Sequence, residues 1–185
     1  MAAHPADITH FWRAAGPDKW FAKSDAFDGA IRLKFEPVHH AAARGEYDRW
    51  IETAEGALAL LILLDQFPRN LYRGSGHQFA TDPLARKIAT EAIERGHDRA
   101  VLGPGLRDFF YLPYAHSEDM ADQDRGVALC QAQADEANDP ELVKWAIIHR
   151  AIILHFGRFP HRNRCLGRQS TPEEQAFLDQ GGFAG

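Results

Sequence analysis

Two stretches of the chain decide its fold: residues 59–70, ALLILLDQFPRN, and residues 151–163, AIILHFGRFPHRN. Each is a run of large apolar side chains that leads into a Phe-Pro corner and then into arginine and asparagine. Because proline lacks an N–H and pushes the preceding residue out of the α region, the pattern predicts an apolar helix that ends at each corner. The corner prolines, Pro68 and Pro160, stand 92 residues apart.

An arginine beside a glycine, and then a new helix start, follow each corner. This repetition predicts two related halves, at about residues 25–96 and 104–180. A chain of 185 residues has an ordinary size for one domain. We therefore expect a single helical domain over residues 1–185, with pseudo-duplicated halves.

Helix signals recur along the chain, whereas no stretch alternates apolar and polar residues between turn signals as a strand does. Ser24 is placed to cap a first long helix, which Gly45 ends and Pro37 kinks or splits. A second helix, from about Tyr47 to Gln66, carries apolar side chains on more than one face, so we expect other helices to surround it. The predicted fold class is all-α.

Proline at the first helical position marks three later helix starts, because a missing N–H costs nothing there. Each proline follows a residue that commonly caps helices; the pairs are Asp82-Pro83, Asp139-Pro140 and Thr171-Pro172. The last start continues as a capping box between Thr171 and Glu174. Further helices are predicted over about 107–116, where Pro113 interrupts, over 120–137 and over 140–157.

Composition indicates an ordinary globular protein, with 45% hydrophobic and 25% charged residues. The longest uncharged apolar run, residues 56–64, is much shorter than the roughly 20 residues that cross a bilayer. Residues 1–7 lack the features of a secretory signal. Cys130 and Cys165 have no metal-binding spacing and suit a reducing compartment. We expect a cytoplasmic protein without membrane association.

Charge is segregated along the chain although the net charge is only −5, a balance that disfavours general nucleic-acid binding. Residues 118–141 carry eight acids and one cation, whereas residues 150–168 carry five arginines and no acid. Two interpretations stay open. The segments form solvated helix faces of opposite sign, or the arginines form a site for an anion.

Four long segments resemble a family known only as uncharacterised, which is catalogued as domain of unknown function 924. These segments are residues 63–70, LLDQFPRN, residues 79–85, FATDPLA, residues 111–118, YLPYAHSE, and residues 155–174. The resemblance implies helical hairpins packed in a right-handed array of the tetratricopeptide-like superfamily, although the 34-residue repeat consensus is absent. The family supplies no catalytic residues, so the resemblance concerns the fold.

Arginines at both corners suggest a ligand, because the planar guanidinium suits a carboxylate or a phosphate. A histidine and a glutamate in the segment 116–118 would add an acid or a base beside these cations. The candidate ligand-binding residues are Arg69, Asn70, His116, Glu118, Arg158, His161, Arg162 and Asn163. A structural interpretation competes, in which each arginine bonds the free carbonyls at a helix end and each asparagine forms a turn.

The sequence contains no motif that indicates a metal site, a cofactor or a catalytic residue. Ten histidines include no HExxH pair, so we predict no metal site and no cofactor. His149 lies on the apolar face of its helix, where a buried, hydrogen-bonded, neutral ring is expected. Ser117 has no Gly-x-Ser-x-Gly context. Catalytic residues stay unassigned, and so does the question of whether the protein is an enzyme.

Two functional hypotheses follow. The first is a helical-repeat-like binding or scaffold module whose paired helices present a groove to a peptide or protein partner. The alternative is a small-molecule enzyme or sensor with an arginine and histidine pocket for a carboxylate or phosphate ligand. An open, apolar face would favour the module, and a closed polar pocket at the corners would favour the ligand site.

Overall fold

The protein is described by a computed structural model over residues 3–183. Every regular element in this part of the chain is helical, and it contains no strand. The all-α expectation is confirmed. None of the described helices is long and apolar enough to cross a membrane.

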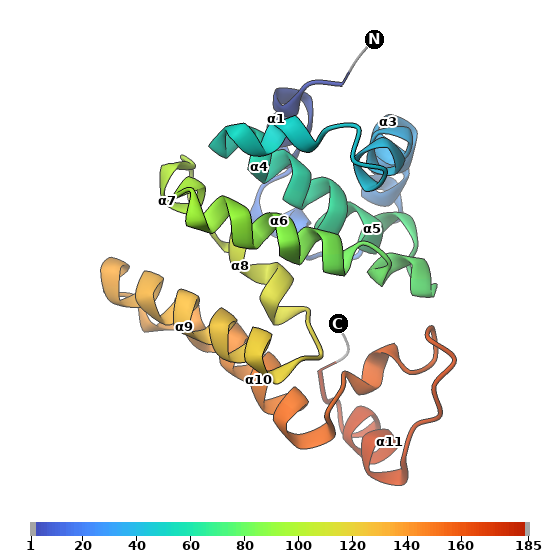
Figure 1. Cartoon of the computed structure of the whole chain (residues 1–185). Helices are drawn as coiled ribbons and strands as arrows, with labels where there is room; N and C mark the ends of the chain where they lie inside the picture. The colour runs from blue at the N-terminus through green and yellow to red at the C-terminus, as the bar shows by residue number, and fades with distance from the viewer. Residues whose placement is uncertain (1–2, 184–185) are drawn as a thin grey trace. The chain divides into compact units, whose positions relative to one another are not determined.

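The chain divides into two compact units (Figure 1). Unit 1 comprises the chain through Arg73 and His77–Pro113, and unit 2 comprises Gly74–Gly76 and the chain from Tyr114 onward. The elements of unit 1 are α1 (Pro5–Ala15), α2 (Pro17–Trp20), α3 (Asp25–Ala43), the 3₁₀ turn η1 (Asp48–Glu52), α4 (Ala54–Leu61), the π turn η2 (Ile62–Gln66), α5 (Phe67–Leu71), α6 (Asp82–Glu94) and α7 (His97–Ala100). Unit 2 contains α9 (Met120–Ala137), the 3₁₀ turn η4 (Pro140–Val143), α10 (Lys144–Phe156), the 3₁₀ turn η5 (Pro160–Arg162) and α11 (Pro172–Asp179). The 3₁₀ turn η3 (Gly76–Phe79) and α8 (Asp108–Ala115) each cross from one unit to the other.

Helix α4 forms the core of unit 1. Residues 57–64 are all buried, and α4 packs against α1 and α6. Beyond its end, the rings of Phe11, Trp12 and Phe35 have centroids 5.2 to 6.3 Å from that of Phe67. The apolar run at 59–67 is thus enclosed by other elements, as its pattern predicted.

The helix that carries the first Phe-Pro corner does not end there, contrary to the prediction. It begins at Ala54 rather than near Tyr47, and it continues through η2 into α5, so Pro68 lies inside a helical path. In η2 the Phe67 N–H bonds to the carbonyl of Ile62, five residues back. This wider turn places Pro68 in the first turn of α5, where its missing N–H is tolerated.

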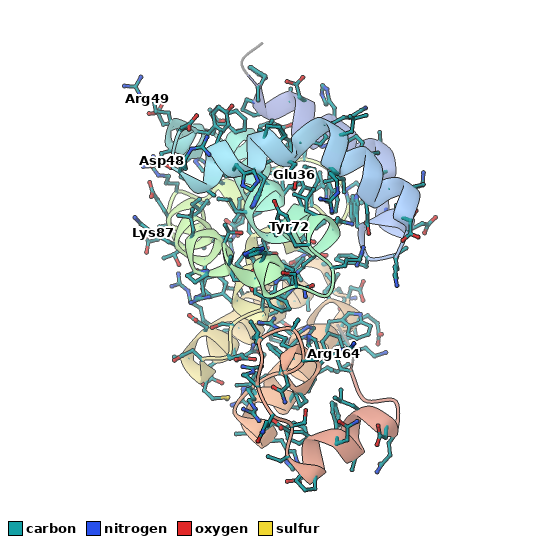
Figure 2. The ribbon with its side chains drawn as sticks, turned by 90° about the vertical axis from the view of Figure 1, so that its right-hand side faces the viewer. Glu36, Asp48, Arg49, Tyr72, Lys87 and Arg164 are labelled. Atoms are coloured by element: carbon teal, nitrogen blue, oxygen red, sulfur yellow. The ribbon has the colours of Figure 1, made fainter. Side chains whose placement is uncertain are left out.

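Two other prolines also lie inside helices: Pro37, which was predicted to kink or split its helix, and Pro113, which was predicted to interrupt one. Helix α3 runs without interruption through Pro37. Leu33, whose carbonyl loses its donor to that proline, is 85% exposed, so water can replace the lost bond. Pro113 lies inside α8. Helix α3 is also joined to the end of α5, because the hydroxyl of Tyr72, the residue after α5, donates a hydrogen bond to Glu36 of α3 at 3.2 Å (Figure 2).

The three predicted helix starts have different outcomes. Thr171 forms the expected capping box with Glu174 at the start of α11. Asp139 accepts the N–H of Glu141, although the chain opens as the 3₁₀ turn η4 before α10 begins. Asp82 does not cap α6, because the cap position belongs to Thr81 and the carboxylate of Asp82 binds an arginine instead. The predicted helix 120–137 is confirmed to the residue.

Unit 2 is built around α9 and α10, which pack against each other. Its core contains Ile152, Ile153 and Phe159, with partly buried apolar side chains from α9, α10 and α11 around them. At the second Phe-Pro corner the helix does end: α10 stops at Phe156, Gly157 follows with φ 70°, and Pro160 opens η5. The two similar stretches therefore adopt different backbones, and the duplication of the halves stays a prediction.

Candidate functional site

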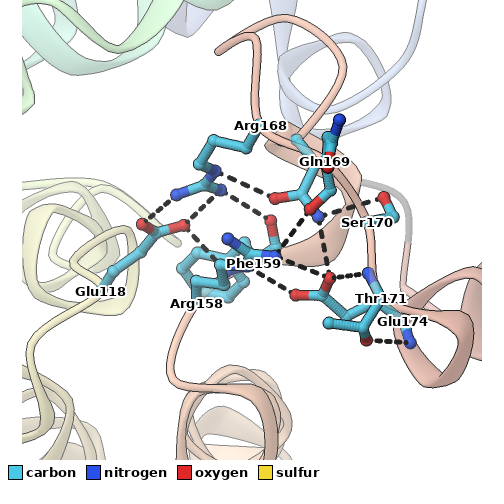
Figure 3. Close-up of polar contacts among 9 residues, drawn as sticks. Glu118, Arg158, Phe159, Arg168, Gln169, Ser170, Thr171 and Glu174 are labelled. Atoms are coloured by element: carbon cyan, nitrogen blue, oxygen red, sulfur yellow. Dashed lines mark hydrogen bonds and ion pairs between the residues drawn. The ribbon is translucent and has the colours of Figure 1, made fainter.

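The second corner is held by two carboxylates (Figure 3). Glu118 accepts hydrogen bonds from both terminal nitrogens of Arg168, at 2.7 and 3.0 Å, and from the N–H of Phe159 at 2.8 Å. Burial would raise the pKa of Glu118, but these hydrogen bonds outweigh it and the pKa is lowered. Glu118 is therefore a charged anchor for the loop and is poorly suited to hold a proton for acid catalysis.

Glu174 is the second carboxylate and is only 2% exposed. It accepts two bonds from Arg158, at 2.6 and 2.8 Å, one from the Thr171 N–H at 2.7 Å and one from the Asn163 amide at 3.2 Å. The Arg158 hydrogen bonds lower the pKa of Glu174 to about 2, against the opposing effect of burial, with help from the Thr171 N–H. Arg158, at the second corner, is thus paired with a carboxylate of the protein itself.

The two ion pairs are joined through the loop between them (Figure 3). Arg168 also donates to the Asn163 side-chain oxygen at 2.9 Å and to the Phe159 carbonyl at 3.1 Å. Arg158 donates to the Gln169 carbonyl at 2.9 Å. Two guanidiniums and two carboxylates cancel in charge, so this network, which we call the loop clamp (Glu118, Arg158, Asn163, Arg168 and Glu174), stabilises the loop.

Imidazole rings gather beside the loop clamp. His161 lies with its ring centroid 5.5 Å from Phe159 and 5.3 Å from Phe183, and His149 lies 4.6 Å from Phe183 and 6.4 Å from His116. His149 is 8% exposed and its Nδ1 is 2.7 Å from the Trp145 carbonyl, in agreement with the expected buried, hydrogen-bonded ring.

His161 has the most perturbed ring of this group. Burial, followed by the positive charge of Arg162 and by His149, lowers its pKa to about 3. The guanidinium of Arg162 lies 4.4 Å from the centroid of the Phe159 ring. His161 is therefore neutral at physiological pH and can bond through either ring nitrogen without carrying charge.

The first corner is also internally satisfied. Arg69 donates to both oxygens of Asp82, at 3.0 and 3.1 Å, and to the main-chain carbonyl of Asp65. Burial lowers the pKa of Arg69, but the charges of Asp65 and Asp82 outweigh this and raise it. Asn70 donates to Asp28 at 2.8 Å.

A groove of about 540 Å³ lies in unit 2 between α10 and α11. Seven of its ten lining residues are apolar: Ile148, Ala151, Ile152, Phe156, Ala176, Phe177 and Phe183. His155 and Glu173, 2.9 Å apart, lie at the rim. Three further large apolar side chains on α10 are exposed, namely Trp145 at 61%, Ile147 at 49% and Leu154 at 64%.

The family described as "Bacterial protein of unknown function (DUF924)" matches residues 8–182. This chain belongs to that family. The chain is similar to a solved structure, "Protein of Unknown Function ATU0120 from Agrobacterium tumefaciens". The two are 53% identical, with a TM-score of 0.89, over 96% of this chain and 97% of that chain. No curated protein matches the sequence. The DUF924 description names no activity.

In this DUF924 protein the predicted site residues fall into three local groups. Arg69 and Asn70 are bonded to acids of unit 1. Arg158 and Asn163 belong to the loop clamp with Glu118, and His116, His161 and Arg162 lie among the rings beside it. The sequence analysis did not predict the ion pairs of Arg168 and Glu174. It counted Arg168 among the five arginines of residues 150–168 and in the turn after the second corner, and it assigned Glu174 only to a capping box. It also did not predict the groove, because no local pattern distinguishes a half-covered apolar face from a covered one.

Among the described residues no group of three or more histidine, cysteine, aspartate or glutamate side chains is placed to hold a metal.

Proposed function

We propose that this DUF924 protein is a binding module whose groove between α10 and α11 takes the apolar face of an amphipathic helix from a protein partner. The observation that carries the proposal is the groove itself, which is open to solvent and lined mainly by isoleucine, phenylalanine and alanine. Contiguous apolar surface rimmed by polar residues is a feature of interaction sites, whereas apolar side chains exposed singly are ordinary.

The dimensions of the groove favour a short helical segment. Helix α11 has eight residues, which corresponds to about 12 Å or two turns. A partner helix along this wall would insert apolar anchors at positions such as i, i+3 or i+4, and i+7. Trp145, whose ring centroid lies 6.5 Å from that of the lining residue Phe183, would extend the contact along α10.

The charge of unit 2 indicates the charge of the partner. The sequence from residue 114 onward carries eleven acids and seven cations, and Arg158 and Arg168 are already paired with acids. The remaining surface is acidic, so we expect basic residues to flank the partner's apolar face.

The loop clamp argues for the module over an anion pocket at the second corner. Its two arginines have their carboxylates within the protein, and an external anion would have to displace one of them. The wider proposal places the helix pairs in the tetratricopeptide-like array that the family resemblance implies and places the protein in the cytoplasm. The pairing of α9 with α10 through a short connection supports a hairpin plan.

The test is a selection of helical peptides from a display library against the whole protein. Bound peptides should shift the fluorescence of Trp145 and the amide resonances of α10 and α11. Ala151→Glu and Ala176→Glu place a carboxylate among apolar walls at exposed groove positions. Each should weaken binding at least about tenfold, since a buried unpaired charge is costly.

Ala128→Glu is the matched control, because Ala128 is exposed on α9 in the same unit and does not line the groove. It should bind the peptides like the wild type. Selected peptides that bind all three variants equally, or a selection that yields only acidic peptides without apolar anchors, would overturn the proposal.

A further inference from the structure

Phe183 lines the groove of unit 2 although it belongs to neither of the two helices that form it. Its ring also contacts four other rings, which we call the socket: the centroids of His149, His161, Phe159 and Trp145 lie 4.6, 5.3, 6.5 and 6.5 Å away. We infer that the partner inserts an aromatic side chain into the socket in place of Phe183, so that the protein's own tail and the partner compete. This inference rests on the proposed function.

The socket suits an aromatic side chain. The ring of Phe183 meets those of His149 and His161 at interplanar angles of 64° and 81°. Edge-to-face contacts at such distances stabilise aromatic pairs beyond the area that they bury. Phe183 therefore shows which kind of side chain fits here, and the apolar anchor of the partner nearest to the socket is expected to be aromatic.

The tail, residues 180–183, is attached mainly to the helix that it follows. Gly181 has φ 79°, and the N–H groups of Gly181 and Gly182 donate to the carbonyls of Leu178 and Phe177 at 3.1 and 2.9 Å. This pattern reverses the chain at the end of a helix and returns Phe183 to the groove. Both bonds lead back to α11, and the contact with α10 is made by the Phe183 ring. A segment held by so few contacts opens at a low free energy.

Phe183 leaves a polar atom of the socket unsatisfied. The Nδ1 atom of His161 is buried and has no hydrogen-bond partner among the described residues. Such an atom costs free energy in the folded state, and the side chain of phenylalanine has no donor or acceptor to offer it. This favours Phe183 as a replaceable occupant over Phe183 as a permanent part of the core.

Competition and a simple wall predict opposite effects when the ring of Phe183 is removed. If the tail must leave before the partner binds, the apparent affinity is reduced by the fraction of molecules in which the tail is in place. Removal of the ring then strengthens binding. If Phe183 is instead a wall of the groove, its removal takes away contact area and weakens binding.

The experiment uses helical peptides selected from a display library in two parallel selections, against the whole wild-type protein and against Phe183→Ala. Fluorescence anisotropy of labelled peptides gives the affinities. The peptides should carry Phe, Tyr or Trp at one fixed position and should bind Phe183→Ala at least about threefold more tightly than the wild type. Replacement of that aromatic residue by alanine should abolish the difference.

Gly181→Ala tests the tail without removal of any ring. An added Cβ would meet no atom within 4 Å, but the positive φ strains alanine and weakens the turn that holds the tail, so binding should become about twofold tighter or more. Gly96→Ala is the matched control, because Gly96 in unit 1 has φ 75° and equally open surroundings, and it should leave binding unchanged. Phe177→Ala, which shortens the wall of the groove on α11, should weaken binding.

Selected peptides that bind Phe183→Ala no more tightly than the wild type, or that lack an aromatic anchor, would overturn the inference and leave the proposed function standing. If neither selection yields a peptide, the proposed function fails and this inference fails with it. Phe183→Ala decides the question if it folds. If it does not fold, the comparison of Gly181→Ala with Gly96→Ala decides, and equal affinities would overturn the inference.

Discussion

Glu174 forms four hydrogen bonds at the second corner, to Arg158, Asn163 and Thr171. It completes the capping box of α11 and at the same time receives Arg158 and Asn163. A carboxylate with several charge-assisted bonds is strongly stabilised in its ionised form. The consequence is that one residue links a helix start to the loop that precedes it.

Glu174→Ala should lower the free energy of unfolding of unit 2 by about 2 to 3 kcal/mol, because the Thr171 N–H and the Asn163 amide lose their acceptor. The control Glu173→Ala removes a side chain that is 72% exposed and should cost less than about 1 kcal/mol. Chemical denaturation of both variants measures the difference. Equal losses would show that the loop clamp does not stabilise the unit.

His161 makes the stability of unit 2 depend on pH. Its pKa is about 3 in the folded protein against 6.5 in the unfolded chain, so the unfolded chain binds the extra proton between these values. The stabilising contribution is complete above pH 6.5 and is lost as pH falls toward 3. The groups around the ring are Arg162, His149, Glu118 and His116.

Between pH 6.5 and pH 5, His161→Gln should therefore lose less stability than the wild type, by up to about 2 kcal/mol. Hydrogen exchange of the α10 amides at the two pH values provides the measurement. Glu174 also titrates with a lowered pKa of about 2, but its effect begins only below its ordinary value of 4.5. An unchanged slope in the variant would mean that the His161 ring is not held neutral by the fold.

The π turn η2 is the element in which a local rule is broken and then compensated. Pro68 cannot donate to the Leu64 carbonyl, and the Thr81 hydroxyl donates to it at 2.5 Å instead. The neighbouring Leu63 carbonyl lies 2.8 Å from His39 Nδ1, and the Asp65 carbonyl accepts from Arg69. Three side chains thus satisfy the carbonyls that the wide turn leaves open.

Thr81→Val should destabilise unit 1 by about 1 to 3 kcal/mol, because it leaves the buried Leu64 carbonyl without its donor while the volume is kept. Thr81→Ser keeps the hydroxyl and should cost less than Thr81→Val. Thermal unfolding of the two variants gives the comparison. If serine is the worse substitution, the methyl group of Thr81 and not its hydroxyl supports the π turn.

The two units of the molecule are stabilised in different ways. In unit 1 residues 57–64 are buried, and aromatic rings surround Phe67 at the start of α5. Unit 2 has a smaller apolar core around Ile152, Ile153 and Phe159, and the loop clamp supplements it. Local opening is easier where few apolar contacts must be broken.

Native-state hydrogen exchange should therefore show that α10 and α11 open at a lower free energy than α4. Mass spectrometry of exchanged, protease-digested protein resolves the helices separately. Exchange of α4 and α10 in one cooperative step would contradict this and would indicate that the units unfold together.

Local chemistry in the sequence was enough to predict the helical class, the span of α9 and the capping box of α11. Each of these features depends on residues a few positions apart, so it can be seen in a short stretch of chain. The family membership likewise rests on long continuous segments. The broad fold was therefore predictable.

Contacts between distant residues settled the remaining features. Pro68 stays inside a helical path because Thr81, which lies outside that path, satisfies the carbonyl that it leaves open. The arginines of the second corner meet acids from α11 and from the segment before α9, so charge segregation along the chain did not reveal their partners. The groove arises where helices leave space between them, and a linear sequence does not record which apolar faces remain uncovered.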